Sequence, residues 1–318
     1  SRGLGDVYKR QLDNNAVEMF DLPNNTPKIN MEGIPKIKSK SKVRKENDEQ
    51  RYNVLVLDTS ASSSFLDSSG NIFYTADTAI DYVKASAKKF IEGVQKADGT
   101  NYVAIVEYKG STANVVSEFS TDFVSLNAAI DGLYASQNTR NVAAGLQKAD
   151  TLINEISNPK AIKNVVLFTT GMTNDGEYSY DGHYNEDTIG SEWRRSDTQV
   201  RLYAYSNAAY AMAETLKSKA TVYSVGLFQM MENMPEEGLE IVQFFKLFSS
   251  ELATSLEHFY DVKDPNDLEF IFGEIADKVT TKDVNFYFAS GEEKDYEAVC
   301  HYSDNYFRKA SCGTRQLD

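Results

Sequence analysis

The sequence predicts an α/β fold: a doubly wound, mostly parallel central sheet with helices on both faces and one short antiparallel edge strand. Short, continuous apolar runs such as residues 54–57 suit strands that are covered on both faces. The segments between these runs carry apolar residues at helical spacing, which indicates amphipathic helices. Strands that alternate with helices are joined by right-handed crossovers, and such crossovers produce a parallel sheet between two layers of helices.

The composition limits the classes of protein to consider. The chain has 318 residues, 41% of them hydrophobic, so it can bury one domain core of about 200 residues with flanking segments. A formal net charge of −14 argues against nucleic acid as a partner, because phosphate binding needs a basic face. With three histidines and two cysteines, an internal zinc site is not expected. No apolar run reaches the eighteen residues of a membrane span, so we expect none in this sequence.

The amino-terminal part does not resemble a folded domain. Residues 6–11 resemble the translated end of an adapter used in sequencing libraries, and we interpret residues 1–11 as an assembly scar. In that case the natural amino terminus is missing and a signal peptide could not be seen. Residues 12–50 are polar and interrupted by prolines, which favours a linker. The basic run at 36–45 fits a solvated linker better than a membrane or nucleic-acid contact.

The body of the chain alternates between strands and helices. We expect strands over residues 54–57, 102–108, 115–119, 165–168, 221–227 and 258–262. We expect helices over residues 75–96, 123–133, 143–156, 202–220, 244–256 and 264–279. The strand at 115–119 follows its predecessor so closely that it fits an antiparallel edge hairpin. Asp264 and Pro265 give the last helix a strong start signal, a capping carboxylate followed by a proline.

One long segment fits neither kind of element. Residues 171–198 form a polar insertion rich in Tyr, Asp, Gly and Ser, and it contains the only tryptophan, Trp193. Loops of this length are usually functional or disordered, and the sequence favours neither. Asp175, near the start of the insertion, is expected to form a turn.

Residues 51–64, RYNVLVLDTSASSS, place an aspartate directly after a buried strand. Ligands of open α/β sheets bind at the carboxyl ends of the strands, so Asp58, Ser60 and Ser62 are expected on the first loop above the sheet. One carboxylate and two hydroxyls are oxygen donors of low charge, which suit a hard cation such as Mg2+. The alternative is a plain turn followed by a helix cap.

Residues 58–62, DTSAS, match the D-x-S-x-S signature of the von Willebrand factor type A domain. The order of elements over residues 53–279 is similar to that family throughout, and the phrases AAGLQKA, TVYSVGLF and DPNDLEFIFGEIADKV resemble secreted or surface bacterial members. The resemblance implies a Rossmann-like domain over residues 51–280 with a metal-ion-dependent adhesion site for Mg2+. It also implies a protein ligand that supplies an acidic side chain to the metal, and an extracellular or cell-surface location.

The sequence departs from the family at two metal-binding positions. The family has a threonine on a second loop, and counting back from Leu146 that position falls on Arg140, with Thr139 one residue earlier. The family has an aspartate on a third loop, and Thr170 stands there instead, which leaves Asp58 as the only matched carboxylate. A fixed positive charge and a missing carboxylate both weaken cation binding, so we expect a degenerate site. The expected metal ligands are Asp58, Ser60, Ser62 and Thr139.

Three functions remain open from the sequence. The first is a non-catalytic adhesion module that binds a protein, with Mg2+ at the Asp58 loop. The second is a metal-free structural or interaction domain of a larger surface protein. The third is an Asp58-dependent phosphatase-like enzyme, which is disfavoured because Ser60 stands where such enzymes need a second aspartate. Nucleotide, dinucleotide and serine-hydrolase motifs are absent from the sequence, so we do not expect an enzyme.

The carboxyl-terminal part differs from the body. Residues 283–289 alternate as a strand, and residues 281–318 resemble the start of a further domain that is cut off. Cys300 and Cys312 are the two cysteines of the chain. They could form a disulfide or remain free thiols, and the sequence leaves both open.

Overall fold

The computed structural model describes residues 49–60, 76–189, 197–227 and 236–280, together with strand segments at 38–39, 65–66, 72–74, 282–289, 295–302 and 312–316. The chain divides into two compact units, Glu46–Thr280 and Ser1–Lys45 with Thr281–Asp318. In the described part of the chain, no helix is long and apolar enough to cross a membrane.

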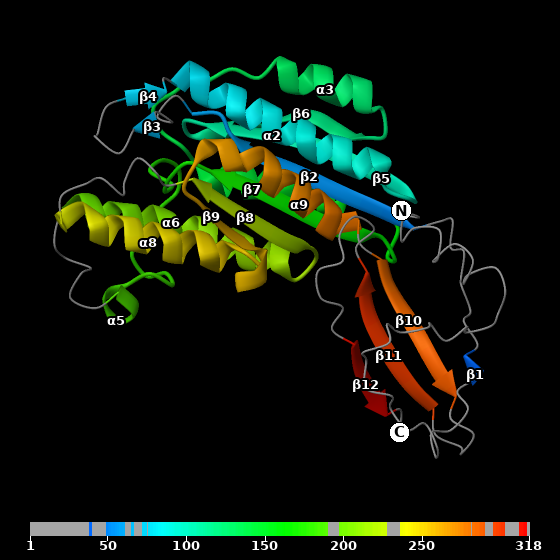
Figure 1. Cartoon of the computed structure of the whole chain (residues 1–318). Helices are drawn as coiled ribbons and strands as arrows, with labels where there is room; N and C mark the ends of the chain where they lie inside the picture. Colours follow the sequence, from blue (N-terminus) through cyan, green and yellow to red (C-terminus); the bar gives the residue numbers. More distant parts are fainter. Residues whose placement is uncertain are drawn as a thin grey trace, which may run out of the picture. The chain divides into compact units, whose positions relative to one another are not determined.

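The larger unit is built on a six-stranded sheet in the order β6-β5-β2-β7-β8-β9 (Figure 1). Its strands are β2 (Gln50–Asp58), β5 (Thr100–Lys109), β6 (Thr112–Ser120), β7 (Ile162–Thr169), β8 (Thr221–Leu227) and β9 (Phe259–Val262). Within this sheet the β5·β6 pair is antiparallel and the other pairs are parallel. In the middle of the sheet, Val56 of β2 is registered with Val106 of β5 and Leu167 of β7. The predicted doubly wound sheet with an antiparallel edge strand is confirmed.

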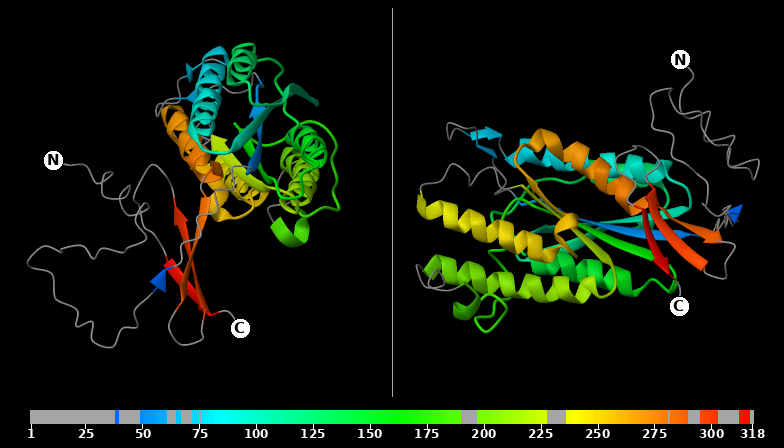
Figure 2. Two further views of the ribbon diagram at one scale, coloured as in Figure 1. Left: turned by 90° about the vertical axis from the view of Figure 1, so that its right-hand side faces the viewer. Right: turned by 60° about the horizontal axis from the view of Figure 1, so that its bottom comes forward.

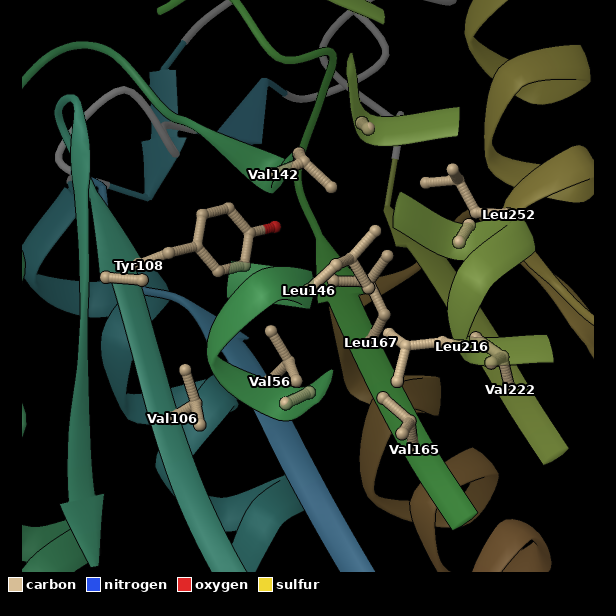
Figure 3. Packing of buried hydrophobic residues seen from close by; sticks show 14 of the residues in the cluster. Val56, Val106, Tyr108, Val142, Leu146, Val165, Leu167, Leu216, Val222 and Leu252 are labelled. Carbon is tan, nitrogen blue, oxygen red and sulfur yellow. The ribbon is translucent and has the colours of Figure 1, made fainter. Parts of the chain in front are cut away.

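Helices cover both faces of the sheet because the buried strands are apolar on both sides (Figures 1 and 2). One face carries α2 (Ala76–Lys96), α3 (Phe123–Asp131) and α9 (Leu268–Thr280), which pack with Leu55 and Leu57. The other face carries α4 (Val142–Asn154), α6 (Asp197–Lys217) and α8 (Glu236–Leu252), which pack with Val54 and Val56. Figure 3 shows Leu146 of α4 lying over the sheet beside Val56 and Leu167. Alternate residues of β2 therefore belong to two separate cores.

Several elements extend beyond their predicted bounds. Helices α6 and α8 begin at Asp197 and Glu236, earlier than the predicted 202 and 244, because their first turns are polar and lack apolar periodicity. Strand β6 is longer than the predicted 115–119, because only one of its faces is covered and polar residues are tolerated on the other. At the last helix, Asp264 caps a 3-10 turn over Pro265–Asp267 by accepting a hydrogen bond from the Asn266 amide at 2.9 Å, and α9 follows.

The smaller unit contains a four-stranded antiparallel sheet in the order β1-β10-β11-β12. Its strands are β1 (Lys38–Ser39), β10 (Lys282–Ala289), β11 (Asp295–Tyr302) and β12 (Cys312–Gln316). Strand β10 matches the expected strand at 283–289, whereas β1 lies in the predicted linker. A two-stranded antiparallel pair, β3 (Phe65–Leu66) with β4 (Ile72–Tyr74), was not predicted. That residues 281–318 begin a further domain stays a prediction.

The packing of α2 on α9 depends on a glycine at the helix contact, and this gives a matched pair of substitutions. A Cβ atom at Gly93 would lie 2.6 Å from the Cβ of Ala276, whereas a Cβ at Gly273 would meet nothing closer than Lys89 Cγ at 3.6 Å. We expect Gly93→Ala to lower the free energy of unfolding by about 1–3 kcal/mol through overpacking. Gly273→Ala should raise it by up to about 1 kcal/mol through helix propensity. Urea unfolding followed by circular dichroism measures both, and equal effects would contradict the close contact.

Candidate ligand-binding site at the Asp58 loop

The candidate site lies where β2 and β7 end at the middle of the sheet. Asp58 is the last residue of β2, and Thr170 directly follows β7. The Thr59 amide donates to the Tyr108 carbonyl at 3.1 Å, and the Ser136 amide donates to the Thr59 carbonyl at 3.1 Å. These backbone bonds fix the Asp58 loop between the end of β5 and the segment before α4. Asp58 and Ser60 lie at the carboxyl edge of the sheet, as expected from the sequence.

The Asp58 carboxylate is buried and its oxygens are engaged inside the protein. Oδ1 accepts a hydrogen bond from the Ser60 amide at 3.0 Å. Oδ2 accepts from the amide of Thr170 at 3.1 Å and from its hydroxyl at 2.8 Å. The Nε atom of Arg140 lies 3.4 Å from the same Oδ2 and completes an ion pair. A buried carboxylate requires such compensation, because an unpaired charge costs several kcal/mol to remove from water.

Arg140 is held in the site by the loop that follows β7. The Arg140 amide donates to Asn174 Oδ1 at 2.8 Å, and the Asn174 amide donates back to the Arg140 carbonyl at 3.0 Å. The Thr173 hydroxyl donates to the same carbonyl at 3.3 Å. The next residue, Asn141, caps α4 by accepting from the Ala144 amide at 3.0 Å. The second and third loops are therefore joined to each other as well as to Asp58.

The other predicted ligands are placed differently. The Thr139 hydroxyl donates to Asp175 Oδ2 at 2.6 Å, so Thr139 has a partner in the adjoining loop. Asp175 also accepts from the Gly176 amide at 2.7 Å, which fits the predicted turn, although its contact with Thr139 was not predicted. Ser60 is buried beside Asp58, and Ser62 lies outside the described residues. The structure thus brings Asp58, Ser60, Arg140 and Thr170 together.

A second set of charged side chains supports the Asp58 loop from β5. Glu107 Oε2 accepts from the Thr59 hydroxyl at 3.1 Å and pairs with Lys109 Nζ at 3.0 Å. Lys109 Nζ also lies 3.9 Å from the ring centroid of Tyr134, a cation–π contact. These residues were missed by the sequence analysis. A glutamate within an otherwise apolar strand was the available signal, because a half-buried carboxylate needs a partner.

The donor set of the described residues does not fit a divalent cation. Asp58 is the one carboxylate among the predicted ligands, and a guanidinium already neutralises it. The described residues contain no group of three or more His, Cys, Asp and Glu side chains that could hold a metal. All-oxygen sites depend on several anionic or neutral oxygens that face the ion, whereas the Thr170 hydroxyl and amide present hydrogens to Asp58. The predicted Mg2+ site at Asp58, Ser60, Ser62 and Thr139 stays a prediction.

The described part of the polar insertion is anchored to two helices. Asn207 of α6 accepts from the Tyr184 amide at 2.7 Å and donates to the Tyr184 carbonyl at 3.0 Å. The Tyr184 hydroxyl donates to Glu251 of α8 at 2.7 Å, and the ring of His183 stacks on Tyr210 with centroids 3.9 Å apart. Burial and the Glu251 carboxylate raise the pKa of the Tyr184 phenol. Residues 178–184 are thus an ordered part of the insertion, while Trp193 lies outside the described residues.

The geometry defines a class of protein: an α/β domain whose loops at the carboxyl edge of the central sheet are held around one buried aspartate. Residues 53–173 match the family model of the von Willebrand factor type A domain. Over residues 53–173 the chain is therefore identified as a von Willebrand factor type A domain.

Relatives and solved structures agree with this assignment. The chain is 25% identical over 99 residues to the collagen alpha-1(VI) chain of Xenopus laevis, a match that spans 31% of this chain and 10% of that relative. The fold resembles the vWF domain of the type V pili tip protein Mfa5 from Porphyromonas gingivalis, with a TM-score of 0.54, 16% identity, and coverage of 73% of this chain and 95% of that one. It also resembles the pilus adhesin SpaC from Lactobacillus rhamnosus GG, with a TM-score of 0.55, 15% identity, and coverage of 81% and 37%.

Tyr108 links the site to the core and yields a prediction on pH. Its buried hydroxyl donates to the Phe168 carbonyl at 2.8 Å. Burial raises the pKa of the Tyr108 phenol well above its usual range, and the Asp58 charge adds to the rise. We expect Tyr108→Phe to lower the free energy of unfolding by about 1–3 kcal/mol near neutral pH, because the carbonyl loses its donor.

The difference in the free energy of unfolding between Tyr108→Phe and the wild type should shrink above about pH 10. There the unfolded wild type releases a proton from Tyr108 that the folded state retains, so the wild type alone loses this part of its stability as pH rises. Urea unfolding at a neutral and an alkaline pH measures the difference. A difference that is constant with pH would show that the phenol does not titrate in this way.

Proposed function

We propose that this domain is a non-catalytic protein-binding module of the adhesion type, and that the loops around Asp58 form its ligand surface. The observation that supports the proposal is the arrangement at the carboxyl edge of the sheet, where one buried aspartate joins three loops. Such loops are pre-organised, so little conformational entropy is lost when a partner binds. The rim of the site is accessible: Tyr134 is 64% exposed, and Gln137 and Asn138 are exposed beside it.

The similar proteins support an adhesive role at a surface. Two of the solved structures are a pilus tip protein and a pilus adhesin, and the curated relative is a collagen chain. We propose from these similarities that the parent protein acts outside the cell or on its surface. The engagement of Asp58 disfavours the phosphatase-like alternative, because both carboxylate oxygens already accept hydrogen bonds from inside the protein.

The metal-free form of this proposal is favoured over the Mg2+ form by the Arg140 ion pair. In the Mg2+ form, Asp58, Ser60, Ser62 and Thr139 would hold the ion, and a carboxylate of the partner would complete its coordination. In the metal-free form, the partner contacts the exposed rim. The two forms differ in their response to a chelator.

The test measures binding of the full chain to immobilised matrix proteins, beginning with collagen, by biolayer interferometry with EDTA or with Mg2+. We expect binding that is equal in both conditions. Asn138→Arg, on the exposed rim, should weaken binding by about tenfold or more. Lys160→Glu is the matched control, because Lys160 is exposed at the opposite edge of the sheet, before β7 begins.

The outcomes separate the proposals. Binding that EDTA abolishes would favour the Mg2+ form. Equal losses in the Asn138 and Lys160 variants would place the ligand surface elsewhere, and failure of every immobilised matrix protein to bind would contradict the adhesive role.

A further inference from the structure

The Arg140 guanidinium lies beside the Asp58 carboxylate, where a bound cation would otherwise be expected. We infer that the Arg140 guanidinium is the resident cation of the Asp58 loop, so that the site is complete without a metal ion and excludes a divalent cation. The Asp58 side chain has no exposed surface and the Arg140 side chain is 7% exposed, with Nε 3.4 Å from Oδ2. The charge that a bound cation would supply is therefore already present as a covalent part of the chain.

The guanidinium is confined to this place by its surroundings. A Cβ atom at Gly171 would lie 2.0 Å from Arg140 Nη1, so the guanidinium packs directly against the glycine backbone. The Arg140 backbone is fixed by Asn174 and Thr173 on the same loop. Any side chain at residue 171 would displace the guanidinium, and glycine is required for this close approach.

Electrostatics then oppose the entry of a metal. A divalent cation beside Asp58 would meet a fixed positive charge within a few ångströms in a water-poor site, where repulsion is weakly screened. The ion would also have to displace the two Thr170 donors from Oδ2. The Arg140 charge and the two Thr170 donors thus both oppose the binding of a divalent cation at Asp58.

The experiment asks whether two substitutions turn the site into a metal site. Arg140→Thr removes the resident charge, and Thr170→Asp adds a second carboxylate beside Asp58. We expect the thermal unfolding midpoint of the wild-type chain to be the same in EDTA, Mg2+ and Mn2+. In the double variant, millimolar Mn2+ should raise the midpoint by roughly 5 °C, since an ion that binds only the folded state stabilises it.

Two controls keep the outcome interpretable. Adding Asp58→Asn to the double variant should abolish the response to Mn2+. Arg140→Lys keeps a positive charge and Arg140→Gln removes it at similar length, so the lysine variant should retain more of the wild-type unfolding midpoint. A rise with Mn2+ in the wild type that Asp58→Asn abolishes would overturn the inference. Equal thermal unfolding midpoints for Arg140→Lys and Arg140→Gln would also overturn the inference.

This inference can fail independently of the proposed function. A wild-type domain that binds Mn2+ through Asp58 would overturn the resident cation but could still bind a protein partner at the rim. Conversely, if no matrix protein binds, the proposed function fails, but the inference that Arg140 excludes a divalent cation from the site is unaffected. The metal titration and the partner assay therefore report on different claims.

A separate observation in the smaller unit concerns the two cysteines. Strands β11 and β12 are antiparallel, and their register places Cys300 opposite Cys312. Residues directly opposite each other in an antiparallel pair have Cα atoms about 4.5–5.5 Å apart, within the range that a disulfide spans. The register thus favours pairing, a question that the sequence left open.

We propose that Cys300 and Cys312 form a cross-strand disulfide that joins β11 to β12. The two thiols lose two protons and two electrons as the S–S bond forms, and the disulfide of a thiol–disulfide oxidoreductase accepts the electrons and becomes a dithiol. Such a bond fits a protein that is exported to an oxidising compartment. Within these 318 residues, Cys300 and Cys312 are the two cysteines, so each has the other as its partner in this sequence.

Thiol counting tests this pairing. The full chain is produced in an oxidising compartment, denatured without reductant, treated with an alkylating reagent and weighed by mass spectrometry. In the wild type we expect no alkylated cysteine before reduction and two after reduction. In Cys312→Ser we expect one alkylated cysteine without reduction. Two alkylated cysteines in the unreduced wild type, or a disulfide-linked dimer on a non-reducing gel, would overturn the proposal.

Discussion

The arrangement of the loops at the carboxyl edge of the central sheet depends on one buried charge, the Asp58 carboxylate, which must be neutralised and hydrogen-bonded. Asp58 ends the central strand, where water is excluded, and an unpaired carboxylate at such a place would cost several kcal/mol. Its partners are the Ser60 amide, the two donors of Thr170 and the Arg140 guanidinium. These partners come from three different loops. Satisfying one side chain therefore fixes three loops relative to each other.

The same principle continues outward from the site. Thr59 and Lys109 share the carboxylate of Glu107, while Thr139 and Asp175 join the second loop to the third. Each of these contacts removes freedom from a segment that would otherwise be mobile, since loops have few apolar contacts of their own. The exposed rim consequently lies beside residues that are joined to one another by hydrogen bonds and ion pairs. A rigid rim suits recognition, because a partner does not have to order it on binding.

Much of the fold could be predicted from the sequence, because apolar runs and helical periodicity report directly on burial. The strands β2, β5, β7 and β8 were found in this way, and the change in pairing at β6 followed from its short connection. The first turns of α6 and α8 were missed because polar turns carry no periodic signal. Once the rest of a helix has formed, each further residue adds one backbone hydrogen bond, so a helix can extend into such a turn.

The site could be predicted only in part. Counting along the loops placed Arg140 and Thr170 beside Asp58, because a family motif fixes positions in sequence. The pairing of Thr139 with Asp175, and of Thr59 with Glu107, joins residues 36 and 48 positions apart, and no local pattern contains that information. Ser60 was expected to offer a hydroxyl to a metal, whereas the contact seen with Asp58 is made by its amide.

A fixed arginine and a bound metal differ in what they allow a partner to do. A metal can leave one coordination position open for a partner's carboxylate, and its occupancy changes with ion concentration. The Arg140 guanidinium is a covalent part of the chain, its side chain is 7% exposed, and it already pairs with Asp58, so it offers a partner little direct contact. Under the proposed function, recognition falls to the rim, where Lys109 Nζ lies over one face of the Tyr134 ring and Tyr134 is 64% exposed. Aromatic side chains of this kind dominate the energetics of protein interfaces. Under the proposed function, the ion pair would support the ligand surface, and the rim beside it would determine which partner binds.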